Sequence, residues 1–137
     1  MVFCAFSNLS SRTLGSATIF VHAGLDPRVD SDEFLSQPWT SFTDAQWAWI
    51  HGDFLKWQGG FNGRIVIHGH TPPHMHRELT GQDDPHLLMV DRLGLDGGTT
   101  RTGIVAGAQI ENGRYRILRA GVRGSGSTAL GAVHPPG

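Results

Sequence analysis

Short apolar runs separated by polar stretches dominate the chain, and this pattern is typical of a sheet built from short strands. Residues 18–21 and 64–67 are rich in β-branched side chains, and both predict buried strands. Residues 87–90 and 103–106 are further strand candidates. Within residues 108–118, alternating runs flank an Asn-Gly pair, which predicts a β-hairpin with a tight turn.

One segment has the spacing of an amphipathic helix. Thr43 fits an N-cap, and Gln46 follows three residues later as in a capping box. A Gly-Gly pair at 59–60 ends the pattern, and prolines with small polar residues predict loops at 26–43 and 75–85. The apolar positions that recur on one face of this helix are Trp47, Ile50, Phe54 and Trp57.

The order of these elements predicts an α/β (α+β) fold in which one main helix packs on a mixed sheet. Because one helix cannot cover both faces of a sheet, we expect the second face to need a cover that the chain does not contain. Residues 1–120 are expected to form the folded domain. Residues 121–137 are rich in Gly, Ser and Pro and predict a disordered tail.

Composition narrows the functional classes. A length of 137 residues suits one domain, and a net charge of −1 gives no basic surface for nucleic acid or anionic lipid. The single cysteine, Cys4, excludes an internal disulfide and favours a reducing compartment, so we expect a cytoplasmic protein. No apolar segment approaches the roughly 18 residues of a membrane helix, and no membrane partner is expected.

Two histidines stand at the ends of predicted strands. His22 and His70 each follow an apolar run, with a glycine within two residues. Ligands of α/β sheets gather at strand ends, and neutral imidazole is a common metal ligand. The two could hold one side of a metal, or each could be an ordinary core or loop histidine. Spacing alone favours the second interpretation.

Further histidines surround this pair. His68 and His70 face the same way in an extended chain, and His74 and His76 repeat that spacing after two prolines. Four such histidines could bind zinc. The alternative, which we favour for His74 and His76, is a solvated loop with surface histidines.

The motifs around these histidines match a known family in order and approximate spacing. Residues 20–27 read Phe-Val-His-Ala-Gly-Leu-Asp-Pro and resemble a F-V-H-A-G-[IL]-x-P motif. Residues 66–72 read Val-Ile-His-Gly-His-Thr-Pro and resemble V-x-H-G-H-T-P, while residues 93–98 are similar to a late Asp-Gly segment. The match spans about residues 20–118, and it includes Trp49, Ile50 and Phe54, which resemble the helix after the first motif. The chain thus resembles the C-terminal half of a calcineurin-like metallophosphoesterase of the serine/threonine protein phosphatase type.

This resemblance implies a helix-flanked β-sandwich that hydrolyses phosphate esters, with a phosphoprotein or a dinucleoside polyphosphate as substrate. It implies that His22 and His70 bind one metal of a dinuclear centre of manganese, iron or zinc, which holds the phosphate and activates a water. Asp96 matches a family aspartate whose role we interpret as structural. His51 stands where the family places a phosphate-gripping arginine, which makes it a weak candidate for substrate contact.

The family's N-terminal motifs D-x-H-G, G-D-x-x-D-R-G and G-N-H-E are absent in context. Residues 84–86 and 90–92 imitate two of them, and we interpret both as coincidence. We therefore expect a partial phosphoesterase domain that is inactive alone. It would derive from a fragmentary gene, from a wrongly assigned start, or from a split enzyme whose partner chain is the N-terminal half.

Two alternatives remain from the sequence. The first is a non-catalytic module that binds divalent metal or another protein. The second is a chain without stable function, which would aggregate because its sheet is left uncovered.

Overall fold

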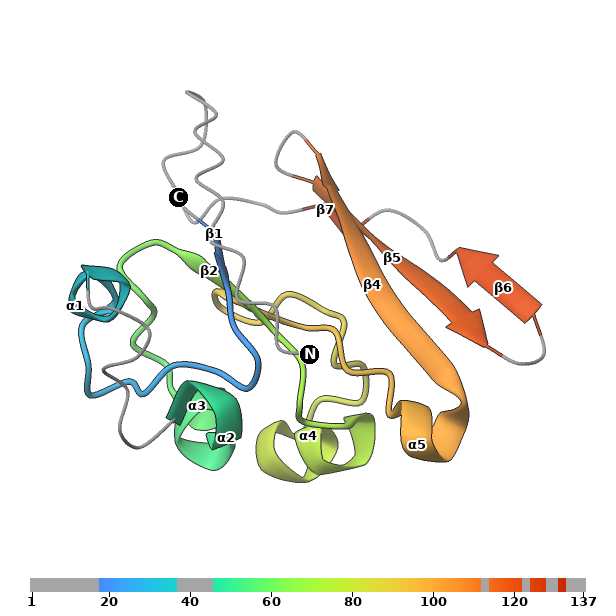
Figure 1. Cartoon of the computed structure of the whole chain (residues 1–137), viewed down its shortest axis with the longest axis horizontal. Helices are drawn as coiled ribbons and strands as arrows, with labels where there is room; N and C mark the ends of the chain where they lie inside the picture. The colour runs from blue at the N-terminus through green and yellow to red at the C-terminus, as the bar shows by residue number, and fades with distance from the viewer. Residues whose placement is uncertain (1–17, 37–45, 112–113, 122–123, 128–130, 133–137) are drawn as a thin grey trace.

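The computed structural model describes residues 18–36, 46–111, 114–121, 124–127 and 131–132, which form a mixed α and β structure compatible with an α+β fold. Its helices lie mainly along one side of the parallel strands, and a long β-hairpin lies on the other (Figure 1). The described helices are α1 (Ser31–Ser36), α2 (Gln46–Trp49), α3 (Gly52–Lys56), α4 (Pro73–Thr80) and α5 (Thr99–Thr102).

The strands form two separate sheets instead of the single mixed sheet that the pattern predicts. The first contains β1 (Thr18–Phe20), β2 (Ile65–His68) and β3 (Arg92–Gly94), all parallel and in that order. The second is antiparallel, with β5 paired to β4, β6 and β7. Its strands are β4 (Ile104–Glu111), β5 (Arg114–Gly121), β6 (Gly124–Ser127) and β7 (Gly131–Ala132).

The helices cover one face of the parallel sheet. Ile19 and Val66 point from neighbouring strands into a cluster that also contains Phe54 and Leu55 of α3. Phe54 and Val66 are fully buried. The sequence predicts this layer, in which the apolar face of a helix packs on apolar strands.

The antiparallel sheet covers the other face. Ile67 of β2 and Leu93 of β3 form a second cluster with Tyr115 and Ile117 of β5, and all four are buried. The expectation that the chain lacks a cover for this face is therefore wrong. The cover comes from the predicted hairpin, whose inward side chains alternate with outward arginines along β5. The Asn-Gly pair at its turn lies outside the described residues.

The predicted long helix is two short ones. Helix α2 ends at Trp49 and α3 begins at Gly52, with His51 between them at φ −130° and ψ −87°. A stacking contact with His70 and a hydrogen bond with Thr71 hold His51 in this break. Tertiary contacts override the helical pattern here. The predicted N-cap, Thr43, lies outside the described residues.

Two segments predicted as loops contain helices. Helix α4 begins at Pro73 and ends before Gly81, whose φ is 74°, and this Pro-then-Gly order is typical of helix termini. Helix α1 is capped by Asp30, whose side chain accepts hydrogen bonds from the backbone N–H groups of Asp32 and Glu33. The loop predictions for 26–43 and 75–85 are wrong for these residues.

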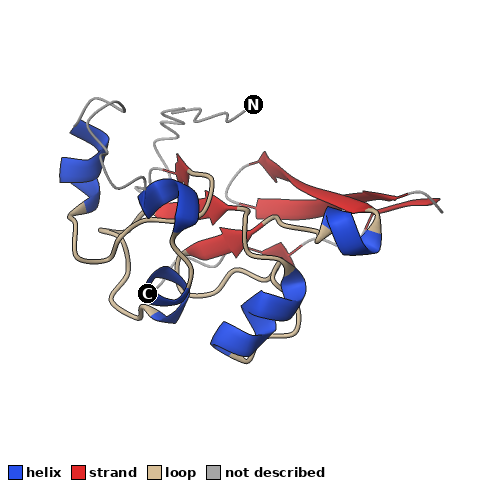
Figure 2. Cartoon of the chain, turned by 60° about the horizontal axis from the view of Figure 1, so that its bottom comes forward, coloured by secondary structure: helices blue, strands red, loops and turns tan. Residues whose placement is uncertain are grey.

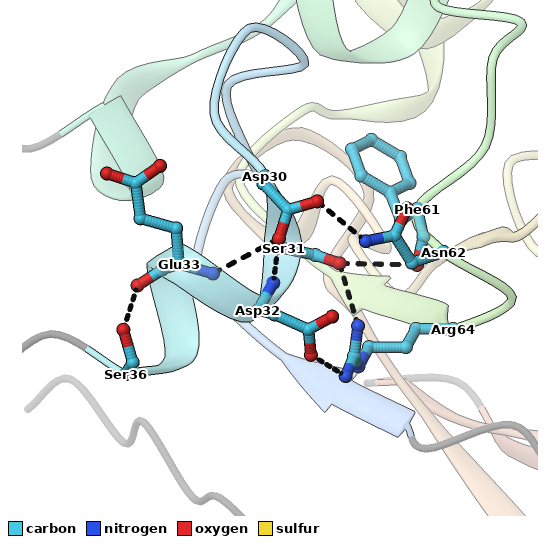
Figure 3. Close-up of polar contacts among 8 residues, drawn as sticks. All are labelled: Asp30, Ser31, Asp32, Glu33, Ser36, Phe61, Asn62 and Arg64. Atoms are coloured by element: carbon cyan, nitrogen blue, oxygen red, sulfur yellow. Dashed lines mark hydrogen bonds and ion pairs between the residues drawn. The ribbon is translucent and has the colours of Figure 1, made fainter.

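Polar contacts attach α1 to the turn before β2 (Figure 3). Arg64 donates to Ser31 and pairs with Asp32, and Asn62 donates to Asp30 at 2.7 Å. Because Arg64 immediately precedes β2, these contacts join the first helix to the central strand of the parallel sheet.

The strand predicted at 87–90 is instead a turn, and β3 begins at Arg92. Arg92 is buried, and its guanidinium donates to the carbonyl oxygens of Phe54 and Trp57 at the end of α3. A buried cation thus donates to carbonyls at the C-terminal end of the helix, where intrahelical donors run out. The tail predicted as disordered from residue 121 contains β6 and β7, so the prediction fails for those residues.

Candidate metal site

Two predicted metal ligands and the aspartate of the late segment, whose role we interpret as structural, lie at one edge of the parallel sheet. His22, His70 and Asp96 each stand two residues beyond the end of β1, β2 and β3, respectively. The register pairs Phe20 with Ile67 and Ile67 with Leu93, so the three strands end at about the same level. This carboxyl edge is where α/β sheets usually bind ligands.

The imidazoles of His22 and His70 face each other directly. Nε2 of His22 lies 3.1 Å from Nδ1 of His70, and the ring centroids are 4.8 Å apart. That separation suits a hydrogen bond between the rings. It also suits two ligands of one ion, because zinc–nitrogen bonds of about 2.0–2.1 Å at angles of roughly 90–109° place two nitrogens roughly 2.8–3.4 Å apart.

His70 has two further features of a ligand-binding residue. Its φ is 64°, a left-handed backbone that is uncommon outside glycine and clusters at functional sites. Its Nε2 is buried and has no hydrogen-bond partner among the described residues. Buried polar nitrogens are normally satisfied, so this atom has capacity for a further contact.

His51 is the third imidazole at this edge, and we refer to His22, His51 and His70 together as the histidine cluster. The ring of His51 stacks on that of His70 with centroids 4.6 Å apart and planes inclined by 22°. Its Nδ1 lies 3.0 Å from Oγ1 of Thr71, which is buried. The rings of His51 and His70 lie face to face, so their nitrogens do not converge on one point between them.

Trp49 forms an exposed wall beside the cluster. Its indole meets His70 edge-on with centroids 5.6 Å apart, yet 68% of the residue remains exposed. A large aromatic ring next to a polar cluster offers a stacking surface to a planar ligand group.

Electrostatics favour the neutral, metal-binding form of His70. Burial lowers the pKa of its imidazole, and the neighbouring His51 and His22 lower the pKa further, whereas Asp96 opposes the shift. Asp96 itself accepts a 2.7 Å hydrogen bond from the backbone N–H of Gly98, which orders the segment after β3. A neutral imidazole keeps the lone pair that a metal requires.

The other histidines do not join this cluster. His68 is buried against Phe54, with ring centroids 4.9 Å apart, and burial lowers the pKa of His68 to about 4. His74 is exposed on α4, whereas His76 is buried on the same helix and contacts Thr80. The proposed four-histidine zinc site is not formed, and no group of three or more His, Cys, Asp or Glu side chains that could hold a metal occurs in the described part of the chain.

Thr71 is a site residue that the sequence reasoning did not identify. Its hydroxyl contacts a histidine 20 positions away, and this contact exists because His51 interrupts the predicted helix. Trp49 is not among the apolar positions of the predicted helical face, and its exposure agrees with that spacing.

No protein-family model, curated protein or solved structure matches the chain. Among the described residues, no helix has the length and apolar character needed to cross a membrane.

Proposed function

We propose that this chain belongs to a metal-dependent hydrolase of phosphate esters, a calcineurin-like metallophosphoesterase of the serine/threonine protein phosphatase type. The observation that carries the proposal is the 3.1 Å approach of His22 and His70 at the carboxyl edge of the parallel sheet. The two residues come from the two motifs on which the family resemblance depends.

In this proposal, His22 and His70 hold one divalent metal through Nε2 and Nδ1, the nitrogens that face each other. Manganese, iron or zinc would suit an imidazole pair completed by oxygen ligands. When bound, the metal centre supplies a Lewis acid for the phosphate and a water of lowered pKa. The chain's own residues orient the ligand: His51 lies against His70, and Trp49 borders the same edge.

The two-sheet structure is compatible with one part of a helix-flanked β-sandwich. Ile67 and Leu93 of the parallel sheet pack against Tyr115 and Ile117 of the antiparallel sheet. Because the described residues bring only two imidazoles together as ligands, we propose that further ligands come from an N-terminal half, in the same chain or in a partner. The described residues alone are then insufficient for catalysis.

Metal binding tests the site independently of turnover. Calorimetry with manganese or zinc should show divalent-metal binding that weakens by at least about 10–100-fold in His22→Ala and in His70→Ala. That is the loss of affinity caused by replacing residues that only support a metal ligand, and these variants remove a ligand itself. His74→Ala, which removes an exposed histidine outside the cluster, is the matched control and should bind like the wild type. Equal affinity in all four proteins would remove the pair from any metal site.

Turnover tests the reaction. The chain should not hydrolyse an aryl phosphate with manganese, whereas a fusion to an N-terminal half carrying the three absent motifs should. Rapid hydrolysis by the chain alone would contradict the proposed incompleteness. A folded fusion that binds metal without turnover would contradict the phosphoesterase function.

A second candidate function is non-catalytic divalent-metal binding. It is favoured by the absence of a third His, Cys, Asp or Glu ligand beside the pair among the described residues. Both functions require His22 and His70, and they differ in whether added N-terminal ligands produce hydrolysis.

A further inference from the structure

We infer that Thr71 fixes His51 in one tautomer, with the proton on Nε2, so that His51 presents a hydrogen-bond donor to an anionic oxygen of the ligand. Thr71 is then a positioning residue, and His51 is an anion contact instead of a third metal ligand. The anion contact rests on the proposed function, whereas the tautomer does not.

The inference starts from the burial of Thr71. Only 2% of the residue is exposed, and among the described residues its hydroxyl has one partner, Nδ1 of His51 at 3.0 Å. A hydroxyl carries one proton to donate and two lone pairs to accept with. A buried hydroxyl whose proton finds no acceptor loses more free energy than one that leaves a single lone pair unused.

The direction of the hydrogen bond follows. If Nδ1 of His51 donated its proton, the Thr71 hydroxyl would have to donate elsewhere, and the described residues provide no second acceptor. If the hydroxyl donates to Nδ1, its proton is satisfied. Nδ1 is then unprotonated, and in the neutral ring the proton must be on Nε2.

Thr80 shows the opposite case on α4. Its hydroxyl also lies near a histidine nitrogen, Nδ1 of His76 at 3.3 Å, but it donates to the backbone carbonyl of His76 at 2.8 Å. The Thr80 proton is therefore not available to the ring. Proximity of threonine to histidine does not set the tautomer; the presence or absence of a competing acceptor does.

The Nε2–H group of His51 is the part of the ring that remains for a ligand. Nδ1 is occupied by Thr71, one ring face is covered by His70, and no described residue accepts a hydrogen bond from Nε2. An N–H donor suits an anionic oxygen, such as that of a phosphate group, and a protonated Nε2 cannot ligate a metal.

The experiment measures the tautomer in the metal-free chain. Two-bond proton–nitrogen NMR, recorded well above the ordinary imidazole pKa of about 6.5, distinguishes protonated from unprotonated ring nitrogens. We expect a protonated Nε2 and a hydrogen-bonded, unprotonated Nδ1 for His51. In Thr71→Val the Nδ1 resonance should move to the value of a nitrogen without a hydrogen bond, and Thr71→Ser should restore it.

Thr80→Val is the matched control and should leave the His51 resonances unchanged. A protonated Nδ1 in the wild type would overturn the inference even if every variant failed to fold. An unchanged Nδ1 resonance in a folded Thr71→Val protein would overturn it as well.

A second arm tests the anion contact with inorganic phosphate and manganese as the probe. Replacing His51 by Phe keeps a ring for stacking and removes the donor, so phosphate affinity should fall about tenfold. An unchanged phosphate affinity would overturn the anion contact. The tautomer of His51 is tested separately by the NMR measurement. Hydrolysis itself is judged separately by the turnover assay of the fused protein.

Discussion

His70 is the residue on which the candidate site depends most. Its left-handed backbone, at φ 64°, directs the ring toward three aromatic neighbours, His22, His51 and Trp49. Such a backbone costs on the order of 1–3 kcal/mol in a residue other than glycine, and it persists where the surroundings determine it. The ring is therefore placed by its backbone and its neighbours together.

Two substitutions at His70 separate backbone strain from metal binding. Asn tolerates left-handed backbone, whereas Val at positive φ is a severe outlier. We expect His70→Val to unfold at a free energy about 1–2 kcal/mol below that of His70→Asn, measured by urea denaturation, because both variants lose the same ring contacts. Both should lose metal binding equally in calorimetry. Equal stability of the two would contradict the left-handed backbone.

His68 should make the protein sensitive to acid. Burial lowers the pKa of His68 from 6.5 to about 4, so in this range the unfolded chain binds a proton that the folded protein does not. The free energy of unfolding should therefore fall as the pH decreases from 6.5 to about 4, by up to about 3 kcal/mol for this group.

His68→Leu removes that titration and should flatten the decrease in urea denaturation across the same pH range. His74→Ala removes an exposed histidine and should keep the wild-type profile. A profile of His68→Leu that matched the wild type would show that His68 is not the buried neutral group described here.

At the scale of elements, the helix break at His51 places the cluster. A continuous helix through residues 46–57 would satisfy the apolar spacing but would not leave His51 in the backbone conformation seen between α2 and α3. In the structure, α3 keeps Phe54 in the core, and its last carbonyls are satisfied by Arg92 of β3. Helix α3, which packs in the core, and His51, which belongs to the histidine cluster, are thus adjacent in sequence but have different roles.

Gly24 of the first motif is required by the packing of α3. A Cβ atom built at Gly24 would lie 2.4–2.8 Å from three atoms of the Phe54 ring, which is fully buried. Gly24→Ala should lower the free energy of unfolding by about 1–3 kcal/mol in urea denaturation, as overpacked cores do.

A double-mutant cycle with Phe54→Leu tests the cause. The smaller side chain should accept the added methyl group, so the cost of Gly24→Ala should shrink in the Phe54→Leu background. Additive effects would mean that the clash with the ring is not the reason why glycine stands there.

The sequence predicts the strands better than the helices. The apolar runs at 18–21 and 64–67 predict β1 and β2 within a residue, and their ends place His22 and His70 at one edge. Helices α1 and α4 were missed although Asp30 with Glu33, and Pro73 with Gly81, mark their ends. Both helices are short, and their sequences are polar enough to resemble loops.

The histidine cluster could be predicted only in part. Convergence of His22 and His70 follows from strand order, because parallel strands end at one edge. The stack on His51 and the contact with Thr71 depend on where α2 ends, and that is decided by tertiary contacts. Periodicity carries no information about such contacts.

At the scale of the whole molecule, the parallel sheet lies between two apolar clusters. One includes residues of the helices, and the other includes residues of the antiparallel sheet. Figure 2 shows these helices in blue and the strands in red. The second cluster was not expected from the sequence because β5 contributes two apolar residues to it, Tyr115 and Ile117, and these alternate with arginines.

Adjacent residues of β5 test whether this second cluster stabilises the fold. Ile117 is 6% exposed and packs in the cluster, whereas Leu118 is 43% exposed on the opposite face. Ile117→Ala should lower the free energy of unfolding by about 2–4 kcal/mol in urea denaturation, and Leu118→Ala should change it by about 0.5 kcal/mol or less. Similar effects of the two would mean that the hairpin does not cover the parallel sheet.

The central position of β2 has a consequence for how the protein opens. Val66 and Ile67 are consecutive, yet the first belongs to the helix-side cluster and the second to the hairpin-side cluster. Solvent can reach the amide groups of this strand from either face only after one layer has detached. Deuterium should therefore enter β2 last, and the strand that presents His70 at its end should be the slowest-exchanging part of the molecule.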